Sequence, residues 1–151
     1  MDRDTARGIE WDCAQLVTAF YGALDEQRYE DLANLFVTEG GIWNRLGKDL
    51  VGSQAILAAM KTRTDWLTAH LVTNIRVNVI DKDHAETIQY ITLYRHEEWK
   101  PEAGPAPVVL PLGILKHWDK QFRVGQDWKI AHKRSRAMMV DRARVTHYDK
   151  G

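Results

Sequence analysis

Apolar residues in the first third of the chain recur at the three- and four-residue spacing of a helix. Between about residues 7 and 26 this spacing predicts an amphipathic helix, with apolar positions at Ile9, Cys13, Leu16, Val17, Phe20 and Leu24. A shorter helix is predicted over residues 28–36 and ends at the paired glycines of TEGG, 38–41. A third helix is predicted over 53–63, with Ser53 as its N-cap. Between the last two, IWNRLGKDLVG (42–52) predicts two short extended segments around Gly47.

The pattern changes to alternation after residue 67, which indicates strands. Residues 68–80 and 84–99 alternate on either side of a DKD turn at 81–83, as in a β-hairpin. The following loop, KPEAGPAP (100–107), holds three of the four prolines. Two more strands are predicted over 108–122, with a bulge or bend at Pro111 or Gly113, and over 128–135. Residues 136–151 show no clear period and form a basic tail.

Three helices followed by long antiparallel strands define an α+β protein. Because long strands with bends curl, we expect a curved antiparallel sheet that three N-terminal helices cover, giving a cone-shaped α+β barrel. The 151 residues fit one domain, 1–151, with a core over about residues 9–135. The space between the sheet and the helices is the expected place for a ligand.

Composition narrows the classes of function. The chain has 21 basic and 21 acidic residues, so no overall charge favours nucleic acid or an anionic membrane as a partner. Its one cysteine, Cys13, excludes an internal disulfide. The charged N-terminus does not resemble a signal peptide, and the longest apolar run, 106–115, is too short to span a bilayer. We therefore expect a cytoplasmic protein with no membrane or nucleic-acid partner.

Two polar side chains, His70 and Asn74, lie in the first half of the strand predicted over 68–80. The unperturbed pKa of histidine, about 6.5, suits acid–base catalysis near neutral pH. A single histidine on a half-apolar strand is equally typical of a hydrogen-bonded core or rim residue. Asn74 is expected to be structural and to bond the backbone at a bend.

His117 and Asp119 share one face of a strand by its period of two. They fit either a pocket wall beside His70, supplying a general acid, or a plain polar rim. Two histidines and one carboxylate would also suit a metal ion, but strand spacing alone is weak support for that, and no metal site is expected.

Four stretches carry a resemblance to a known family. They are FYGALDEQRYEDLANLF (20–36), GSQAI (52–56), AHLVTN (69–74) and DWKIAHKR (127–134). In this order and spacing they resemble the SnoaL-like group of the nuclear transport factor 2-like superfamily. The resemblance implies a curved sheet with three helices over its concave face and a homodimer formed through the outer face of the sheet. Members include dehydratases, dehydrochlorinases, isomerases and cyclases, together with proteins that catalyse nothing, so the fold alone does not assign a function.

The resemblance also implies site residues. The aspartate that ends the first helix in the scytalone dehydratase and hexachlorocyclohexane dehydrochlorinase branches falls on Asp25, and their strand histidine falls on His70. The bile-acid dehydratase branch has a tyrosine where this chain has Phe20, although Tyr21 is adjacent. Trp43 lies near the position of a substrate-facing tyrosine in scytalone dehydratase. The proposed catalytic residues are His70 and Asp25, and the expected substrate contacts are Tyr21, Trp43, Trp66, Tyr90, His117 and Asp119.

The sequence thus predicts a cofactor-independent lyase or isomerase in which a His–Asp dyad removes a proton. Its tryptophan-rich set of aromatic residues favours a small, hydrophobic and cyclic ligand. Two alternatives use the same cone fold: a small-molecule-binding or accessory protein without chemistry, and a partner chain like the β-subunit of a ring-hydroxylating dioxygenase.

Overall fold

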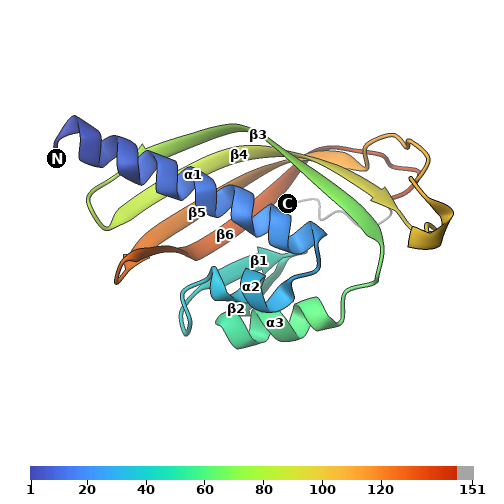
Figure 1. The fold of residues 1–151 in the computed structure, drawn as a ribbon, viewed down its shortest axis with the longest axis horizontal. Helices are drawn as coiled ribbons and strands as arrows, with labels where there is room; N and C mark the ends of the chain where they lie inside the picture. Colours follow the sequence, from blue (N-terminus) through green and yellow to red (C-terminus); the bar gives the residue numbers. More distant parts are fainter. Residues whose placement is uncertain (146–151) are drawn as a thin grey trace.

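The computed structural model describes residues 1–145 and contains one curved sheet with helices on one of its faces (Figure 1). The helices are α1 (Arg3–Asp25), α2 (Tyr29–Asn34) and α3 (Ser53–Lys61), with a 3-10 turn η1 (Pro101–Ala103). The strands are β1 (Ile42–Arg45), β2 (Lys48–Val51), β3 (Leu67–Val79), β4 (His84–His96), β5 (Gly113–Val124) and β6 (Asp127–Val140). The predicted α+β architecture is confirmed: a six-stranded curved sheet, not closed, carries the three helices.

The sheet has the order β2-β1-β6-β5-β4-β3. The four long strands form an antiparallel meander, whereas β1 pairs with β6 in parallel. Helix α1 lies along the inner face of this sheet, and α2, α3 and the β1–β2 hairpin gather beside its C-terminal end (Figure 1). The inner face is therefore covered by helices, and the outer face of the meander is open in this single chain.

The hydrophobic core lies between α1 and the inner face of the sheet. Apolar residues of α1 at helical spacing fill it, as the sequence predicts, together with side chains from α2, α3 and β6. An aromatic cluster anchors the end near β1, where the Phe20 ring lies 5.1 Å from Trp43 and 6.0 Å from Phe36, both edge-on. This cluster fixes the C-terminal half of α1 against the sheet.

Several predicted boundaries are wrong, for local reasons. Helix α1 begins at Arg3 because the Asp2 carboxylate accepts hydrogen bonds from the backbone N–H groups of Asp4 and Thr5. The N-cap of α3 is Gly52, at φ +83°, and Ser53 is already helical.

The last two strands also differ from their predicted limits. Strand β5 begins at Gly113, where a Cβ atom would lie 2.6 Å from the carbonyl oxygen of Met139. Residues 108–112 are not part of a strand, and a register shift follows at Ile114–Leu115. Strand β6 continues to Val140 by pairing with β5, so the sheet extends beyond the predicted core limit at residue 135 into the expected tail. The rest of that tail, 146–151, lies outside the described residues.

Candidate active site

The end of α1 and the start of β3 bring Asp25 and His70 into direct contact. The Nδ1 atom of His70 lies 2.5 Å from Oδ1 of Asp25, and the backbone N–H of His70 donates to Oδ2 at 2.7 Å. The hydroxyl of Thr68 donates to Oδ1 at 2.8 Å. Although 45 positions separate the two residues, they form one hydrogen-bonded unit that is largely buried.

These bonds define the protonation of the pair. Burial acts to raise the pKa of Asp25, but the hydrogen bonds and charge of His70 and the bond from Thr68 outweigh it and lower the pKa. An ionised carboxylate only accepts hydrogen bonds, so the proton between the two residues belongs to Nδ1 of His70. In the neutral ring Nε2 then carries a lone pair. This tautomer is the one that a general base requires.

Arg63, which follows α3, holds the elements of this pair together. Its guanidinium donates to the backbone carbonyl of Leu24 at 3.2 Å and to the hydroxyl of Thr68 at 3.1 Å. The carbonyl belongs to the last turn of α1, where free carbonyl groups need partners. Arg63 therefore fixes the C-terminus of α1 to β3, next to Asp25.

A second polar pair, Tyr21 and His117, lies beside the first. The Tyr21 hydroxyl is 2.8 Å from Nδ1 of His117, and the Tyr21 ring centroid is 5.5 Å from that of His70. Burial, followed by the charge of Asp119, holds the pKa of Tyr21 well above its usual range. Burial, followed by the charges of Lys133 and His70, holds the pKa of His117 well below its usual range. Both groups are therefore uncharged at neutral pH.

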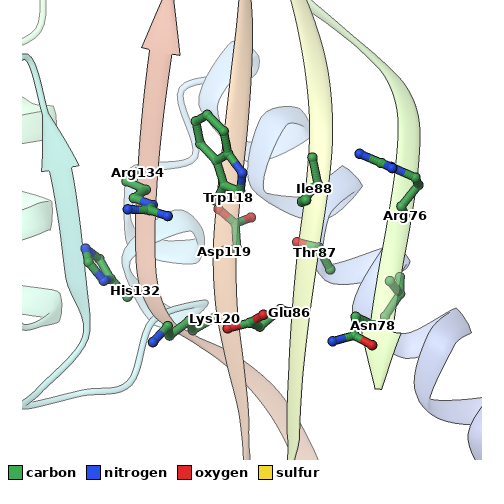
Figure 2. A pocket seen from close by; sticks show the side chains of 11 residues that line it. Arg76, Asn78, Glu86, Thr87, Ile88, Trp118, Asp119, Lys120, His132 and Arg134 are labelled. Atoms are coloured by element: carbon green, nitrogen blue, oxygen red, sulfur yellow. The ribbon is translucent and has the colours of Figure 1, made fainter. Parts of the chain in front are cut away.

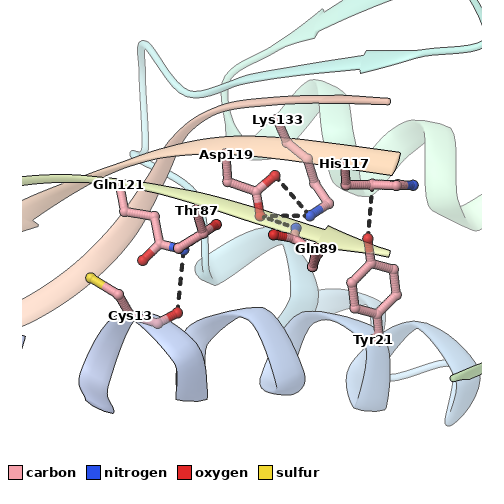
Figure 3. Close-up of polar contacts among 8 residues, drawn as sticks. All are labelled: Cys13, Tyr21, Thr87, Gln89, His117, Asp119, Gln121 and Lys133. Atoms are coloured by element: carbon pink, nitrogen blue, oxygen red, sulfur yellow. Dashed lines mark hydrogen bonds and ion pairs between the residues drawn. The ribbon is translucent and has the colours of Figure 1, made fainter. Parts of the chain in front are cut away.

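The carboxylate of Asp119, which is predicted to contact a substrate, is held in a buried ion pair. Both of its carboxylate oxygens bind Nζ of Lys133, at 3.0 and 2.9 Å, and the amide of Gln89 donates to Oδ2 at 2.9 Å (Figure 3). Neither side chain of the ion pair is exposed to solvent. Burial lowers the pKa of Lys133, and the Asp119 carboxylate opposes that change. Lys133, which lies in the basic run HKR, is not among the residues that the sequence predicts for the site.

The structure does not bring the other three predicted contacts into this group. Trp43 is buried in the aromatic cluster with Phe20 and Phe36. Trp66 precedes β3 and stacks under the guanidinium of Arg95, at 4.3 Å. Tyr90 pairs in register with Lys116 and points to the outer face of the sheet, because its neighbours on β4, Gln89 and Ile91, fill the inner face. Trp43 and Trp66 thus pack against other side chains, and Tyr90 lies on the face of the sheet opposite to His117.

The tryptophan-rich set is thus dispersed over the molecule. Trp11 is 65% exposed on α1, and Trp118 lies on the outer face between Lys116 and Arg134. The inner face next to α1 instead carries buried polar side chains from β4, β5 and β6: Thr87, Gln89, His117, Asp119, Gln121 and Lys133 (Figure 3). The aromatic content of the sequence therefore gives no support for a flat apolar ligand.

Two hollows are found among the described residues, and neither has His70 in its lining. The larger has a volume of about 460 Å³ and includes Arg76, Ile88, Trp118, Lys120 and Arg134 in its lining (Figure 2). The smaller, of about 200 Å³, lies between the first residues of β3, the end of β4 and residues 106–109. Within residues 1–145 no three histidine, cysteine, aspartate or glutamate side chains gather as metal ligands would. No helix in the same residues is long and apolar enough to cross a membrane.

A half-open cone of curved sheet covered by three helices is the fold of nuclear transport factor 2-like proteins. The sequence profile of the SnoaL-like domain matches residues 9–134. The chain belongs to this family, as the four stretches of the sequence indicate.

Solved structures share the fold over most of the chain. Hexachlorocyclohexane dehydrochlorinase LinA-type3 from Novosphingobium barchaimii LL02 superposes with a TM-score of 0.76 at 14% identity, over 99% of this chain and 100% of that one. A putative scytalone dehydratase from Novosphingobium aromaticivorans DSM 12444 gives 0.73 at 20% identity, over 98% and 93%. A Nostoc punctiforme PCC 73102 protein of unknown function with a cystatin-like fold gives 0.70 at 15% identity, over 84% and 89%. At these identities the likeness shows the fold alone. Curated protein sequences give no significant match.

Proposed function

We propose that this protein is a cofactor-independent lyase or isomerase that removes a proton from carbon in a small molecule. His70 is the base, and Asp25 orients it and stabilises the imidazolium that forms. The observation that carries the proposal is the 2.5 Å contact between Nδ1 of His70 and Oδ1 of Asp25, which leaves Nε2 as the basic atom. The family and its dehydratase- and dehydrochlorinase-like structural neighbours support this reaction class.

The neighbouring Tyr21–His117 pair supplies what proton removal also requires. A carbanion or enolate needs hydrogen-bond donors at the atom where charge develops, or an acid at the leaving group. Tyr21 and His117 hold their protons at neutral pH, because burial keeps the phenol protonated and the imidazole uncharged. A substrate held between His70 and this pair would have a base on one side and a hydrogen-bond donor on the other.

The test is deuterium exchange at carbon in a panel of small cyclic ketones, alcohols and halides, followed by NMR in heavy water. We expect the wild-type protein to exchange or eliminate at least one member of the panel. His70→Ala and Asp25→Asn should each lower that rate by about 10²- to 10⁴-fold, the range typical of a general base.

The chain offers a matched control, since His84 and Asp81 form a similar pair on the surface. Nδ1 of His84 lies 2.9 Å from Oδ1 of Asp81, and both side chains are about half exposed. His84→Ala and Asp81→Asn should leave the rate unchanged. Full activity in both dyad variants, with melting temperatures near that of the wild type, would show that the dyad is not catalytic.

A binding or accessory role without chemistry is the second candidate. The buried polar side chains on the inner face favour the accessory role, because they fill space next to α1 that a substrate would otherwise occupy. If no member of the panel exchanges but one of them shifts the resonances of His70 and Tyr21, this second function is the correct one.

A further inference from the structure

The ion pair of Lys133 and Asp119 is the most deeply buried charged group of the described chain, and the proposed reaction leaves it without a role. The two residues lie opposite each other on β6 and β5, with neither side chain exposed. Removing two charges from water costs several kcal/mol per ion, so a buried pair commonly stabilises a fold no better than apolar side chains of similar size. Stability alone therefore does not account for a lysine at this position.

The position of the charge indicates what it acts on. Nζ of Lys133 lies 4.3 Å from the ring centroid of Phe20 and 5.0 Å from that of Tyr21. The hydroxyl of Tyr21 in turn meets His117, whose side chain shares the inner face with Asp119 two positions along β5. Figure 3 shows the ion pair and the Tyr21–His117 bond side by side above α1. Lys133 thus contacts the Tyr21–His117 pair on the inner face of the sheet.

Charged and titratable groups reach His117 from four elements. Tyr21 comes from α1, His70 from β3, Asp119 from β5 itself and Lys133 from β6, while β4 contributes the uncharged Gln89 opposite it. A positive charge on His117 would be buried and repelled by Lys133. Both effects favour the neutral ring.

We propose that Lys133 is a positioning residue that holds His117 uncharged, with the Tyr21 hydroxyl donating to Nδ1 and the remaining ring proton on Nε2. His117 then presents an N–H donor, whereas His70 presents a lone pair at the same ring atom. A donor of this kind fits an oxygen atom of the ligand, either a carbonyl that becomes an enolate or a hydroxyl. An uncharged His117 also avoids a second positive charge next to His70 when that ring takes up its proton.

The protonation of His117 needs no substrate to be measured, so its test is independent of the proposed function, although the role of the donor in catalysis rests on that function. The full chain is labelled with ¹⁵N-histidine, and long-range ¹H–¹⁵N correlation spectra are recorded from acidic to alkaline pH. The His117 signals are assigned from a His117→Asn variant. We expect a neutral ring with its proton on Nε2 in the wild type at neutral and alkaline pH, and uptake of a second ring proton only at acidic pH.

The decisive variant replaces both members of the ion pair, Lys133→Met with Asp119→Asn, so that no buried charge is left unpaired. Burial, the larger cause, remains in this variant, but without the lysine charge His117 should take up a proton at a higher pH than in the wild type. The control is the exposed pair Lys82 and Asp83, replaced by Met and Asn in the same way, which should not move the His117 titration.

Three results would overturn the proposal. They are a wild-type His117 with its proton on Nδ1, a wild-type ring that is charged at neutral pH, and a double variant in which His117 titrates as in the wild type. Loss of deuterium exchange in the dyad variants, or its absence in the wild type, concerns only the proposed function. If the double variant does not fold, the His117 titration is measured in Lys133→Met alone, and a shift in the same direction is required.

Discussion

Two histidine–aspartate pairs in this chain show how burial distinguishes a candidate base from a surface contact. The side chains of His70 and Asp25 are 11% and 23% exposed, whereas those of His84 and Asp81 are 47% and 52% exposed. Three hydrogen bonds from β3 converge on the Asp25 carboxylate, so its position is fixed from several directions. In the surface pair, water competes for the same groups. The burial of a His–Asp pair and its further hydrogen bonds therefore say more about a catalytic role than the distance between the two side chains.

Among single residues, His117 should make the stability of the fold depend on pH. Its pKa in the folded protein is well below the value of about 6.5 expected in the unfolded chain, because burial and then Lys133 and His70 disfavour its charge. Below pH 6.5 the unfolded state therefore binds a proton that the folded state does not. The free energy of unfolding should fall as pH drops from about 6.5 towards the folded pKa, by up to about 1.4 kcal/mol per pH unit, and this contribution should be constant above 6.5.

Urea denaturation of the wild type and of His117→Asn, at several pH values, measures this contribution. Asparagine keeps an oxygen that can accept a hydrogen bond from the Tyr21 hydroxyl, so the variant should stay folded. Its free energy of unfolding should lose the part of the pH dependence below pH 6.5 that His117 causes. His84→Asn is the control and should keep the wild-type slope. Parallel curves for the wild type and His117→Asn would mean that His117 takes up its proton at the same pH in the folded protein as in the unfolded chain.

At the scale of one element, strand β3 is divided by a bulge. The pairing of β3 with β4 shifts register between Thr73 and Arg76, and Asn74 between them has φ +54°. The first half of the strand carries Thr68 and His70 to Asp25, and the second half is regular sheet. The structural role predicted for Asn74 at a bend agrees with this left-handed backbone, which asparagine adopts more readily than most residues.

Substitutions at Asn74 should follow backbone strain. Asn74→Ala should lower the free energy of unfolding by about 1 kcal/mol, because a Cβ without a polar side chain disfavours the left-handed conformation. Asn74→Gly should cost no more than a few tenths, since glycine adopts that conformation freely. Denaturant titration gives these values, and Asn78→Ala, exposed on the same strand, is the control. Equal losses for the alanine and glycine variants would show that the amide, not the backbone, is what matters at this position.

Periodicity predicted the elements, and the resemblance predicted the dyad residues, but neither could show Lys133. Trp128 and Ile130 face inward on β6, so simple alternation would place His132 inward and Lys133 outward. The register of β5 and β6 shifts between Lys120 and Gln121, which leaves Ala131 as an extra residue in β6. This bulge reverses the alternation and turns Lys133 towards Asp119. A bulge of this kind depends on pairing between strands and leaves no mark in the sequence of one strand.

At the scale of the whole molecule, the charge is neutral but unevenly placed. The outer face of the meander carries several basic side chains that form no ion pair within residues 1–145, among them Arg76, Lys116, Lys120, Arg134 and Arg136. Two of them, Lys116 and Arg134, lie 5.0 and 5.3 Å from the Trp118 ring centroid. Glu86 is the acid between these strands, opposite Lys120 (Figure 2).

We propose that two copies of the chain associate through this outer face, as expected for the family, and this arrangement determines how the dimer should respond to salt. A twofold axis places the same patch on both subunits, so the basic side chains of one copy would approach those of the other. Salt screens such repulsion, with a screening length of about 10 Å at 0.1 M. Association should therefore strengthen from low to high salt, the reverse of an interface held by ion pairs. Sedimentation equilibrium at both salt concentrations measures this change.

A single substitution tests whether the dimer forms through the outer face of the meander. Ile88 lies in the larger hollow of the outer face, so Ile88→Arg adds one more like charge per subunit and removes apolar area. It should yield a monomer at every salt concentration, whereas Trp11→Arg on the exposed side of α1 should associate as the wild type does. A dimer that persists in Ile88→Arg, or one that dissociates in high salt, would place the contact elsewhere on the molecule. In that case the basic outer face, with Trp118 between two cations, would be left free in the dimer.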